Sequence, residues 1–118
     1  LSICYDVRFP ELYRQFGEID IITVPAAFTY ETGKRHWHTL LTSRAIENLC
    51  YVIGSAQWGE HYGKRKTYGH SMIVGPWGEI QNQLPIGNGV VVSEIDLDQL
   101  ADIRSKFPAL SHRRINND

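Results

Sequence analysis

The stretch LSICYDVRFPELYR, residues 1–14, places a cysteine between a strand-like and a helix-like segment. Residues 1–4 are predicted to be the end of a strand. Pro10 suits the first position of a helix, which is predicted to cover residues 10–16 and to end at Gly17. A strand, a turn and a helix in this order are the building pattern of α/β proteins.

The rest of the chain continues this alternation. IDIITV (residues 19–24) and CYVIGSA (residues 50–56) are apolar runs typical of buried parallel strands, and helical spacing of apolar residues joins them at about 35–48. Loops are predicted at 25–33 and 57–67, further strands at 68–74, 79–84 and 88–95, a tight turn at 75–78, and a last helix at 97–107 capped by Asp96. The predicted fold class is therefore α/β, a layered sheet with helices on at least one face.

The composition narrows the classes of partner. The 118 residues are 42% hydrophobic and 21% charged, and a net charge of −1 gives no basic footprint for nucleic acid or an anionic membrane. No apolar run approaches the roughly 20 residues that span a bilayer. Two cysteines are too few for the disulfide framework of a small secreted domain, so a cytoplasmic location is predicted.

Cys4 is the first candidate for chemistry. At the end of a strand, before a turn into a helix, it occupies the place where open α/β sheets have their sites, and helix N–H groups there can stabilise an oxyanion. A lone cysteine is also often a small buried apolar side chain, so its position leaves both readings open. Arg8 is equally open: it can hold a substrate carboxylate, or it can pair with Asp6 or Glu11.

The histidines indicate no metal site. His36 and His38 are two positions apart in the predicted helix, about 200° around its axis, and cannot easily share a ligand sphere. His70 is predicted in a strand, where a core histidine is favoured over a base for Cys4.

Three other residues of interest are interpreted as structural. Cys50 opens an apolar strand and is predicted to lie in the core. Arg44 and Glu47 lie one turn apart in the predicted helix 35–48, and a buried pair between them is favoured over a catalytic role for Glu47.

The segment ICYDVRFPELYR resembles the nucleophile segment of the nitrilase superfamily of carbon–nitrogen hydrolases. The similarity continues in register through VPAAFTYETGKRHWHTLLTSRAIENLCYVI, AQWGEHYGKRKTYGHSMIVGPWGEI and FPALSHRR, and is greatest to the Nit-type amidase branch. The resemblance implies that residues 1–118 form the C-terminal half of a carbon–nitrogen hydrolase domain, an αββα sandwich, beginning at its nucleophile strand.

The resemblance also implies roles for single residues. Cys4 matches the nucleophile, and the backbone N–H of Tyr5 matches part of the oxyanion hole. Arg8 matches a position that holds a substrate carboxylate in some members, while Phe28 and Thr29 match pocket-lining positions. The implied reaction is hydrolysis, through a cysteine thioester, of a small carboxylate-bearing α-keto amide such as deaminated glutathione, with no cofactor and no metal.

In the family, a catalytic Glu and a Lys lie upstream of the cysteine, in a region that would precede residue 1. The chain alone is therefore expected to be catalytically incomplete. It is also expected to associate with an N-terminal half or with itself as a homo-oligomer, because its sheet faces and edges would otherwise be exposed. Two alternatives stay open: a non-catalytic remnant or binding module of the same fold, and a self-contained hydrolase in which His70 activates Cys4.

Overall fold

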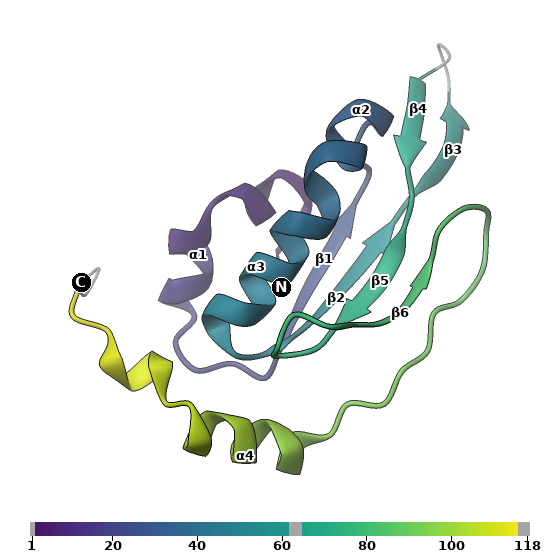
Figure 1. The fold of residues 1–118 in the computed structure, drawn as a ribbon. Coiled ribbons are helices and arrows are strands. Elements are labelled where there is room, and N and C mark those ends of the chain that lie inside the picture. The colour runs from purple at the N-terminus through teal and green to yellow at the C-terminus, as the bar shows by residue number, and fades with distance from the viewer. Residues whose placement is uncertain (1, 62–64, 116–118) are drawn as a thin grey trace.

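A four-stranded mixed sheet forms the centre of the fold. The structure, a computed structural model, describes residues 2–61 and 65–115. In spatial order the strands of the sheet are β1 (Ile21–Ala26), β2 (Tyr51–Ala56), β5 (Ser71–Val74) and β6 (Ile80–Leu84). β1 and β2 run parallel, whereas β5 and β6 each pair antiparallel with the preceding strand in this order. A separate antiparallel pair, made of β3 (Trp58–His61) and β4 (Arg65–Tyr68), extends beyond one end of the sheet (Figure 1).

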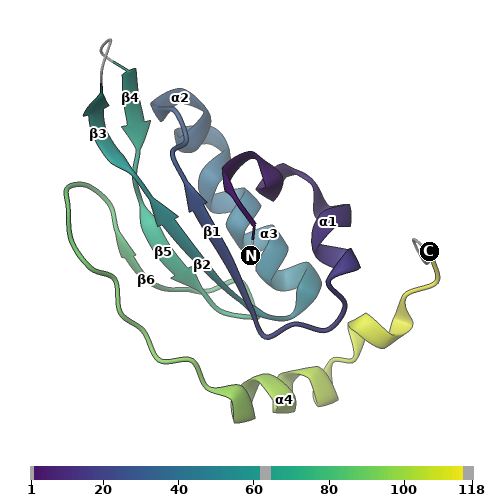
Figure 2. The same cartoon turned by 180° about the vertical axis from the view of Figure 1, so that it is seen from behind.

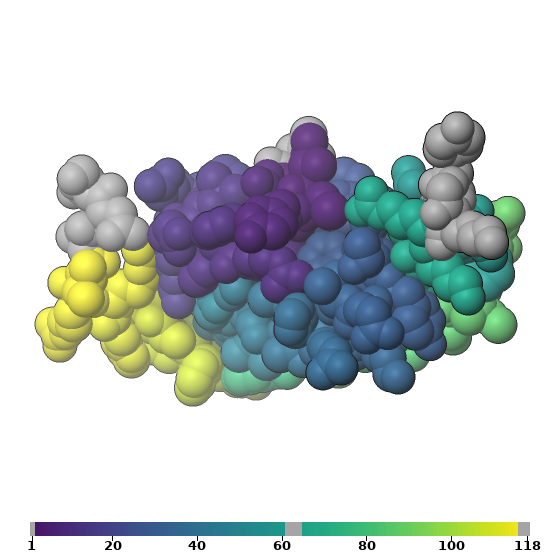
Figure 3. Space-filling view, turned by 90° about the horizontal axis from the view of Figure 1, so that it is seen from above, coloured from purple at the N-terminus to yellow at the C-terminus, as the bar shows by residue number. Residues whose placement is uncertain are grey.

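Helices cover one face of this sheet and one of its ends. They are η1 (Cys4–Arg8, a 3-10 helix), α1 (Pro10–Gln15), α2 (Tyr30–Thr32), η2 (Gly33–Trp37, a π-helix), α3 (His38–Asn48), α4 (Leu97–Lys106) and η4 (Ala109–His112, a 3-10 helix). Figures 1 and 2 show α3 lying along the sheet, with α1 beside it and α4 beyond the strand ends. Figure 3 shows the C-terminal segment and the β3–β4 hairpin at opposite ends of the molecule. This arrangement confirms the predicted α/β class.

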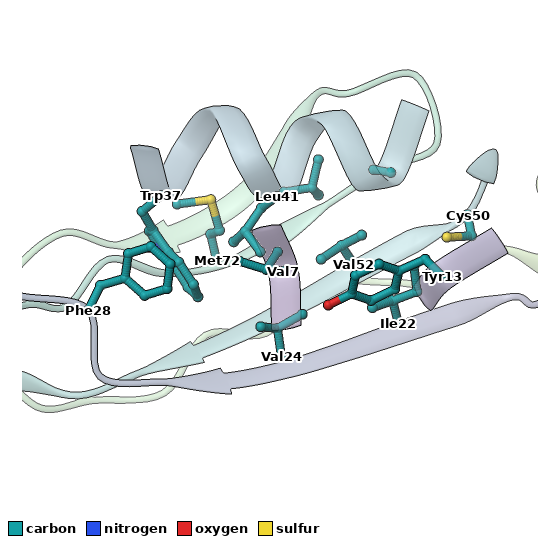
Figure 4. Close-up of a cluster of buried hydrophobic side chains, with 12 residues drawn as sticks. Val7, Tyr13, Ile22, Val24, Phe28, Trp37, Leu41, Cys50, Val52 and Met72 are labelled. Atoms are coloured by element: carbon teal, nitrogen blue, oxygen red, sulfur yellow. The ribbon is translucent and has the colours of Figure 1, made fainter. Parts of the chain in front are cut away.

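The core lies between α3 and the sheet (Figure 4). Trp37 and Leu41 approach from the helical side, Val24 and Val52 from the strands, and each of these side chains is fully buried. Gly54 of β2 lies directly under them, where an added Cβ would be 2.8 Å from Trp37 Cζ2 and 2.6 Å from Leu41 Cδ1. Only glycine therefore fits at this position, and its small size lets α3 approach the sheet closely.

The predicted loop at residues 57–67 is wrong, because the β3–β4 hairpin forms there. Trp58 faces Tyr68 across the two strands, and Glu60 faces Lys66. Aromatic and oppositely charged cross-strand pairs stabilise a hairpin even where the sequence has little apolar alternation. Residues 62–64 of the predicted loop lie outside the described residues.

The predicted strand at 88–95 is also wrong, since these residues form neither helix nor strand. Val90 is 85% exposed, and the segment is tied to β6 by a side chain: Asn82 Nδ2 donates to the Val92 carbonyl at 2.8 Å. The apolar alternation of this segment indicated a strand, but the described residues provide no backbone ladder for it.

Two further boundaries differ from the prediction. Gly69 and His70 both have positive φ, +71° and +62°, and they separate β4 from β5 within the predicted strand 68–74. The helix predicted from about residue 35 begins earlier, at Tyr30, so it takes up part of the predicted loop 25–33. The helix predicted at 10–16 and the turn at 75–78 are confirmed, the latter by a 2.9 Å bond from the Gly78 N–H to the Gly75 carbonyl.

The last helix, α4, is joined to the rest of the protein through Arg104. Its Nε donates to the Leu49 carbonyl at 3.0 Å, Nη2 donates to the Ile19 carbonyl, and Nη1 lies 3.0 Å from Asp20 Oδ1. The predicted cap is confirmed at the other end of the helix, where Asp96 Oδ1 accepts from the Gln99 N–H at 2.9 Å. Arg104 therefore satisfies carbonyl groups next to the N-terminal ends of β1 and β2 and fixes α4 against them.

We expect Arg104→Ala to lower the free energy of unfolding by about 2 kcal/mol, because two carbonyl groups lose a charged donor. Urea denaturation measures this loss. Lys106→Ala is the matched control on the same helix, since its ion pair with Asp102 is exposed and contributes little. Equal stability losses for the two variants would contradict the structural role of Arg104.

Cys50 lies in the core, as predicted, with no exposed surface. Burial raises the pKa of its thiol from 9.0 to about 12, with Arg104 opposing and Asp20 adding to the shift. The folded state therefore holds the thiol protonated over a pH range in which the unfolded chain releases the proton. Stability from this residue is complete below about pH 9 and is lost as the pH rises towards 12.

Between pH 8 and pH 10 we expect the free energy of unfolding of the wild type to fall by about 1.4 kcal/mol more than that of Cys50→Ala. The readout is the difference in pH dependence, since the substitution also leaves a cavity and lowers stability at every pH. Parallel pH profiles for the two proteins would show that the Cys50 thiol does not titrate differently on folding.

Candidate functional site

Cys4 stands at a strained point of the backbone. Its φ is +44°, in the left-handed region that residues other than glycine seldom adopt, and it is the first residue of the short helix η1. Such strain costs about 1–3 kcal/mol and is concentrated at functional sites. The preceding residues 2 and 3 lie in no assigned strand, so the prediction of a strand end is wrong for them, and Leu1 lies outside the described residues.

Hydrogen bonds hold the backbone on both sides of Cys4. Before it, the Ser2 N–H and hydroxyl both donate to the Thr23 carbonyl, at 3.1 and 3.0 Å, and the buried Tyr13 hydroxyl donates to Ser2 Oγ at 2.8 Å. Burial raises the pKa of Tyr13, so its hydroxyl remains a donor well into the alkaline range. After Cys4, the Asp6 carboxylate accepts from the Ile3 N–H at 3.0 Å. These contacts support the strained conformation.

Cys4 borders a cavity of about 770 Å³. The cavity lies where the parallel strands β1 and β2 end, with Ala26 and Ala56 side by side in register. This is the edge at which parallel sheets place their sites. Most of the lining is small or aliphatic, and among the described residues no charged side chain contributes to it: Ile3, Cys4, Pro25, Ala26, Ala27, Ile53, Gly54, Ser55, Ala56, Gln57, Ser71, Met72, Ile73, Gly89, Val90 and Val91. The cavity thus presents a half-buried thiol among neutral groups.

Tyr5 follows directly in the first turn of η1. Helical N–H groups in a first turn have no acceptor within the helix, so the Tyr5 N–H is of the right type for an oxyanion. The Tyr5 side chain is 65% exposed and packs against Phe9, with ring centroids 5.5 Å apart.

Arg8, the last residue of η1, makes no ion pair with any carboxylate of the described residues. The alternative pairing with Asp6 or Glu11 is therefore not observed, because the Asp6 carboxylate is bound to a backbone N–H. The guanidinium lies 5.2 Å from the Phe28 ring centroid and 5.7 Å from that of Tyr5. Arg8 does not line the cavity beside Cys4.

Phe28 and Thr29 also lie outside the lining of that cavity. Phe28 is 7% exposed, and its ring packs on Trp37 at a centroid distance of 5.0 Å. Thr29 precedes α2, and its carbonyl accepts from the Gly33 N–H at 2.8 Å. The structure therefore brings Arg8 and Phe28 together, while Cys4 opens onto a separate hollow.

His38 and His70 lie close together, with ring centroids 5.6 Å apart, but have different hydrogen-bond partners. His38 Nε2 lies 3.1 Å from Gln83 Oε1, while His70 Nδ1 lies 2.8 Å from the Tyr68 carbonyl and its ring stacks on Tyr68 at 3.8 Å. His70 does not line the cavity of Cys4, so the described residues show no Cys4–His70 dyad. Within the described ranges, no cluster of three histidine, cysteine or acidic residues is suited to a metal ion. In the same part of the chain, no helix is long and apolar enough to cross a membrane.

The predicted structural pair in α3 is confirmed. Arg44 and Glu47 form a pair with an Nη1–Oε1 distance of 2.6 Å, and the Arg44 side chain is 6% exposed. Arg44 Nε also donates to the Val7 carbonyl at 2.9 Å, which connects α3 to η1.

The positive φ of Cys4 was not predicted, because cysteine has no preference for this region that the sequence could reveal.

Comparison with known proteins identifies the family. The sequence pattern of the family described as carbon-nitrogen hydrolase matches residues 1–105. A deaminated glutathione amidase from Synechocystis sp. is 54% identical over 115 residues, which are 96% of this chain and 42% of that protein. The chain therefore spans less than half the length of this relative.

Solved structures agree with this match. The crystal structure of the C. elegans NitFhit protein has a TM-score of 0.91 at 50% identity, over 97% of this chain and 28% of that one. An amidase from Nesterenkonia sp., in which acrylamide has added to the active-site cysteine, has a TM-score of 0.69 at 32% identity, over 90% of this chain and 42% of that one. The chain described here belongs to the carbon-nitrogen hydrolase family.

Proposed function

We propose that this chain carries the nucleophile of an amidase and that Cys4 is that nucleophile. The observation that carries the proposal is the strained backbone of Cys4, φ +44°, at the border of a 770 Å³ cavity. Family membership and the acrylamide adduct on the active-site cysteine of the Nesterenkonia amidase support it.

The proposed reaction has two halves. A general base takes the proton of the Cys4 thiol, Sγ attacks the carbonyl carbon of a primary amide, and the N–H of Tyr5 donates to the oxyanion. The base then gives the proton to the amide nitrogen, and the tetrahedral intermediate expels ammonia to leave a thioester. Water then attacks the thioester carbon, which releases the carboxylic acid and restores the thiol. The general base and a cationic group are proposed to come from outside the cavity lining, since no described lining residue carries a charge.

The proposed substrate is a small amide with a free carboxylate, of the α-keto amide type. The name of the relative, deaminated glutathione amidase, supports this class. So does Arg8, a half-buried guanidinium on the same short helix as Cys4, because in the described residues it has no carboxylate partner of its own. Arginine binds carboxylates bidentately with planar geometry.

Association with a further polypeptide segment, or with a second copy of the chain, stays a prediction. An apolar side chain that is exposed on the sheet face turned away from α3 supports this association: Ile21 of β1 is 42% exposed there. The alternative of a non-catalytic binding module also remains, and the first experiment below decides between it and the amidase.

In the complete enzyme, we expect Cys4→Ala to reduce ammonia release from an α-keto amide by roughly 10³-fold or more, since no thioester can form. Cys50→Ala is the matched control: it removes the second thiol from the core and should cost stability while leaving kcat close to wild type. Mass spectrometry of the wild type under turnover should detect the acyl group on the peptide containing Cys4. Equal turnover by Cys4→Ala and the wild type would refute the assignment, and absence of any turnover or acylation in the wild type would favour the binding module.

Arg8→Ala should raise KM for a carboxylate-bearing amide by roughly 30-fold, or about 2 kcal/mol, with a smaller effect on an amide that lacks the carboxylate. Arg14→Ala provides the control, because Arg14 is also half-buried but lines neither the Cys4 cavity nor the surroundings of Phe28. Steady-state kinetics on the two amides measures the difference. An unchanged preference for the carboxylate would make Arg8 a structural residue.

A further inference from the structure

We propose that His36 is the positioning residue for Arg8: its neutral imidazole accepts a hydrogen bond that fixes the guanidinium for a substrate carboxylate. The inference rests on the proposed carboxylate-binding role of Arg8. His36 itself is not proposed to contact the substrate.

The contact has a defined polarity. Arg8 Nη1 lies 3.2 Å from His36 Nδ1. A guanidinium has donors and no acceptor, so Nδ1 must be unprotonated and accept, which places the imidazole proton on Nε2. One N–H of Arg8 is used in this bond, and the remaining donors stay available for a carboxylate.

Three segments of the chain meet at the Arg8 guanidinium. Phe28 and Tyr5 contact it through their ring faces, with centroid distances of 5.2 and 5.7 Å, and His36 supplies its hydrogen-bond acceptor within the described residues. An arginine side chain has about 2 kcal/mol of rotamer entropy to lose on binding. Ring contacts fix the orientation of the guanidinium plane but leave the group free to rotate within that plane. A directional hydrogen bond to Nδ1 restricts this rotation as well.

Buried neighbours determine where His36 points. His36 lies in the π-helical segment η2, a type of local widening that is frequent at functional sites. The next residue, Trp37, is fully buried and its Nε1 donates to the His70 carbonyl at 2.8 Å. Gly33, at the start of the same segment, is so close to Tyr68 that an added Cβ would lie 2.3 Å from Tyr68 Cβ. With both ends of η2 fixed against other elements, the exposed His36 is held over Arg8 although it contributes little to the core.

A purely structural role and a positioning role predict different kinetics. Removal of an exposed histidine that only fills space changes stability slightly and affects all substrates alike. A histidine that orients Arg8 affects KM for substrates with a carboxylate, and its effect requires that Arg8 be present. The acceptor atom, rather than the ring, is then the essential feature.

The test uses the complete enzyme with two matched amides, one bearing a free carboxylate and one with that group replaced by a methyl ester. His36→Ala should raise KM for the carboxylate amide about tenfold, with kcat nearly unchanged and with little effect on the ester. His36→Asn, whose Oδ1 can replace Nδ1 as acceptor, should recover most of this loss. Arg35→Ala is the control, since it removes a neighbouring exposed side chain from the same segment.

The double variant Arg8→Ala/His36→Ala separates this inference from the proposed function. We expect its KM for the carboxylate amide to equal that of Arg8→Ala, because His36 acts only through Arg8. If Arg8→Ala abolishes the preference for the carboxylate but His36→Ala does not alter it, the positioning role is refuted while the role of Arg8 stands. If Arg8→Ala leaves the preference unchanged, the carboxylate-binding role of Arg8 fails, and the role of His36 fails with it. Equal effects of His36→Ala on both amides, or no recovery in His36→Asn, would also overturn the inference.

Discussion

The buried guanidinium of Arg44 connects the helical layer to the segment that carries Cys4. Its Nη1 lies 2.6 Å from Glu47 Oε1, and its Nε donates at 2.9 Å to the carbonyl of Val7, the last residue but one of η1. A buried charge is costly unless its donors are satisfied. Once α3 has packed on the sheet, Arg44 therefore requires the Val7 carbonyl as an acceptor, and this requirement fixes the position of Val7. Asn48 Nδ2, which donates to the Arg44 carbonyl at 2.9 Å, reinforces the same turn of α3. The path of η1, and with it the place of Cys4, therefore depends on a side chain far from it in sequence.

This dependence explains how a non-glycine residue remains at φ +44°. Cys4 lies between two fixed points: Ser2, bonded to Thr23 of β1, and Val7, which is fully buried and bonded to Arg44. The chain between these points has to turn sharply, and the cost of the left-handed conformation, about 1–3 kcal/mol, is offset by contacts that are made elsewhere. The strain directs the residue to the end of β1 and β2, where small side chains leave a cavity.

Sequence patterns predicted the elements whose signals are local. The 3.6-residue period identified α3, and the apolar runs identified β1 and β2. The C-terminal ends of α3 and β2 are as predicted, whereas both ends of β1 and the start of β2 moved by one or two residues. The capping side chain of Asp96 and the turn between Gly75 and Gly78 were predicted because their chemistry is contained within four residues. The Arg44–Glu47 pair follows in the same way from the spacing of one helical turn.

The features that the sequence did not reveal depend on contacts between distant segments. Residues 88–95 have a strand-like pattern, but side-chain bonds to β6 hold them without a ladder. His70 adopts a positive φ after Gly69, a conformation that stays uncommon for histidine and that the sequence pattern did not indicate. The candidate site shows the same division: the motif predicted Cys4 and Arg8, whereas the cation–ring contacts of Arg8 and its bond to His36 required three segments to be placed in space.

The short helix η1 also sets a distance between the two groups that the proposed function uses. Cys4 and Arg8 are its first and last residues. A 3-10 helix rises about 2.0 Å per residue, so four steps along η1 place the two residues roughly 8 Å apart along the axis. Cys4 borders the cavity and Arg8 does not, so the two side chains serve different parts of the surface. If both act on one substrate, its amide carbon and its carboxylate must be separated by several bonds. An extended dicarboxylic amide meets this requirement, and a very short one such as an amide of oxalate does not.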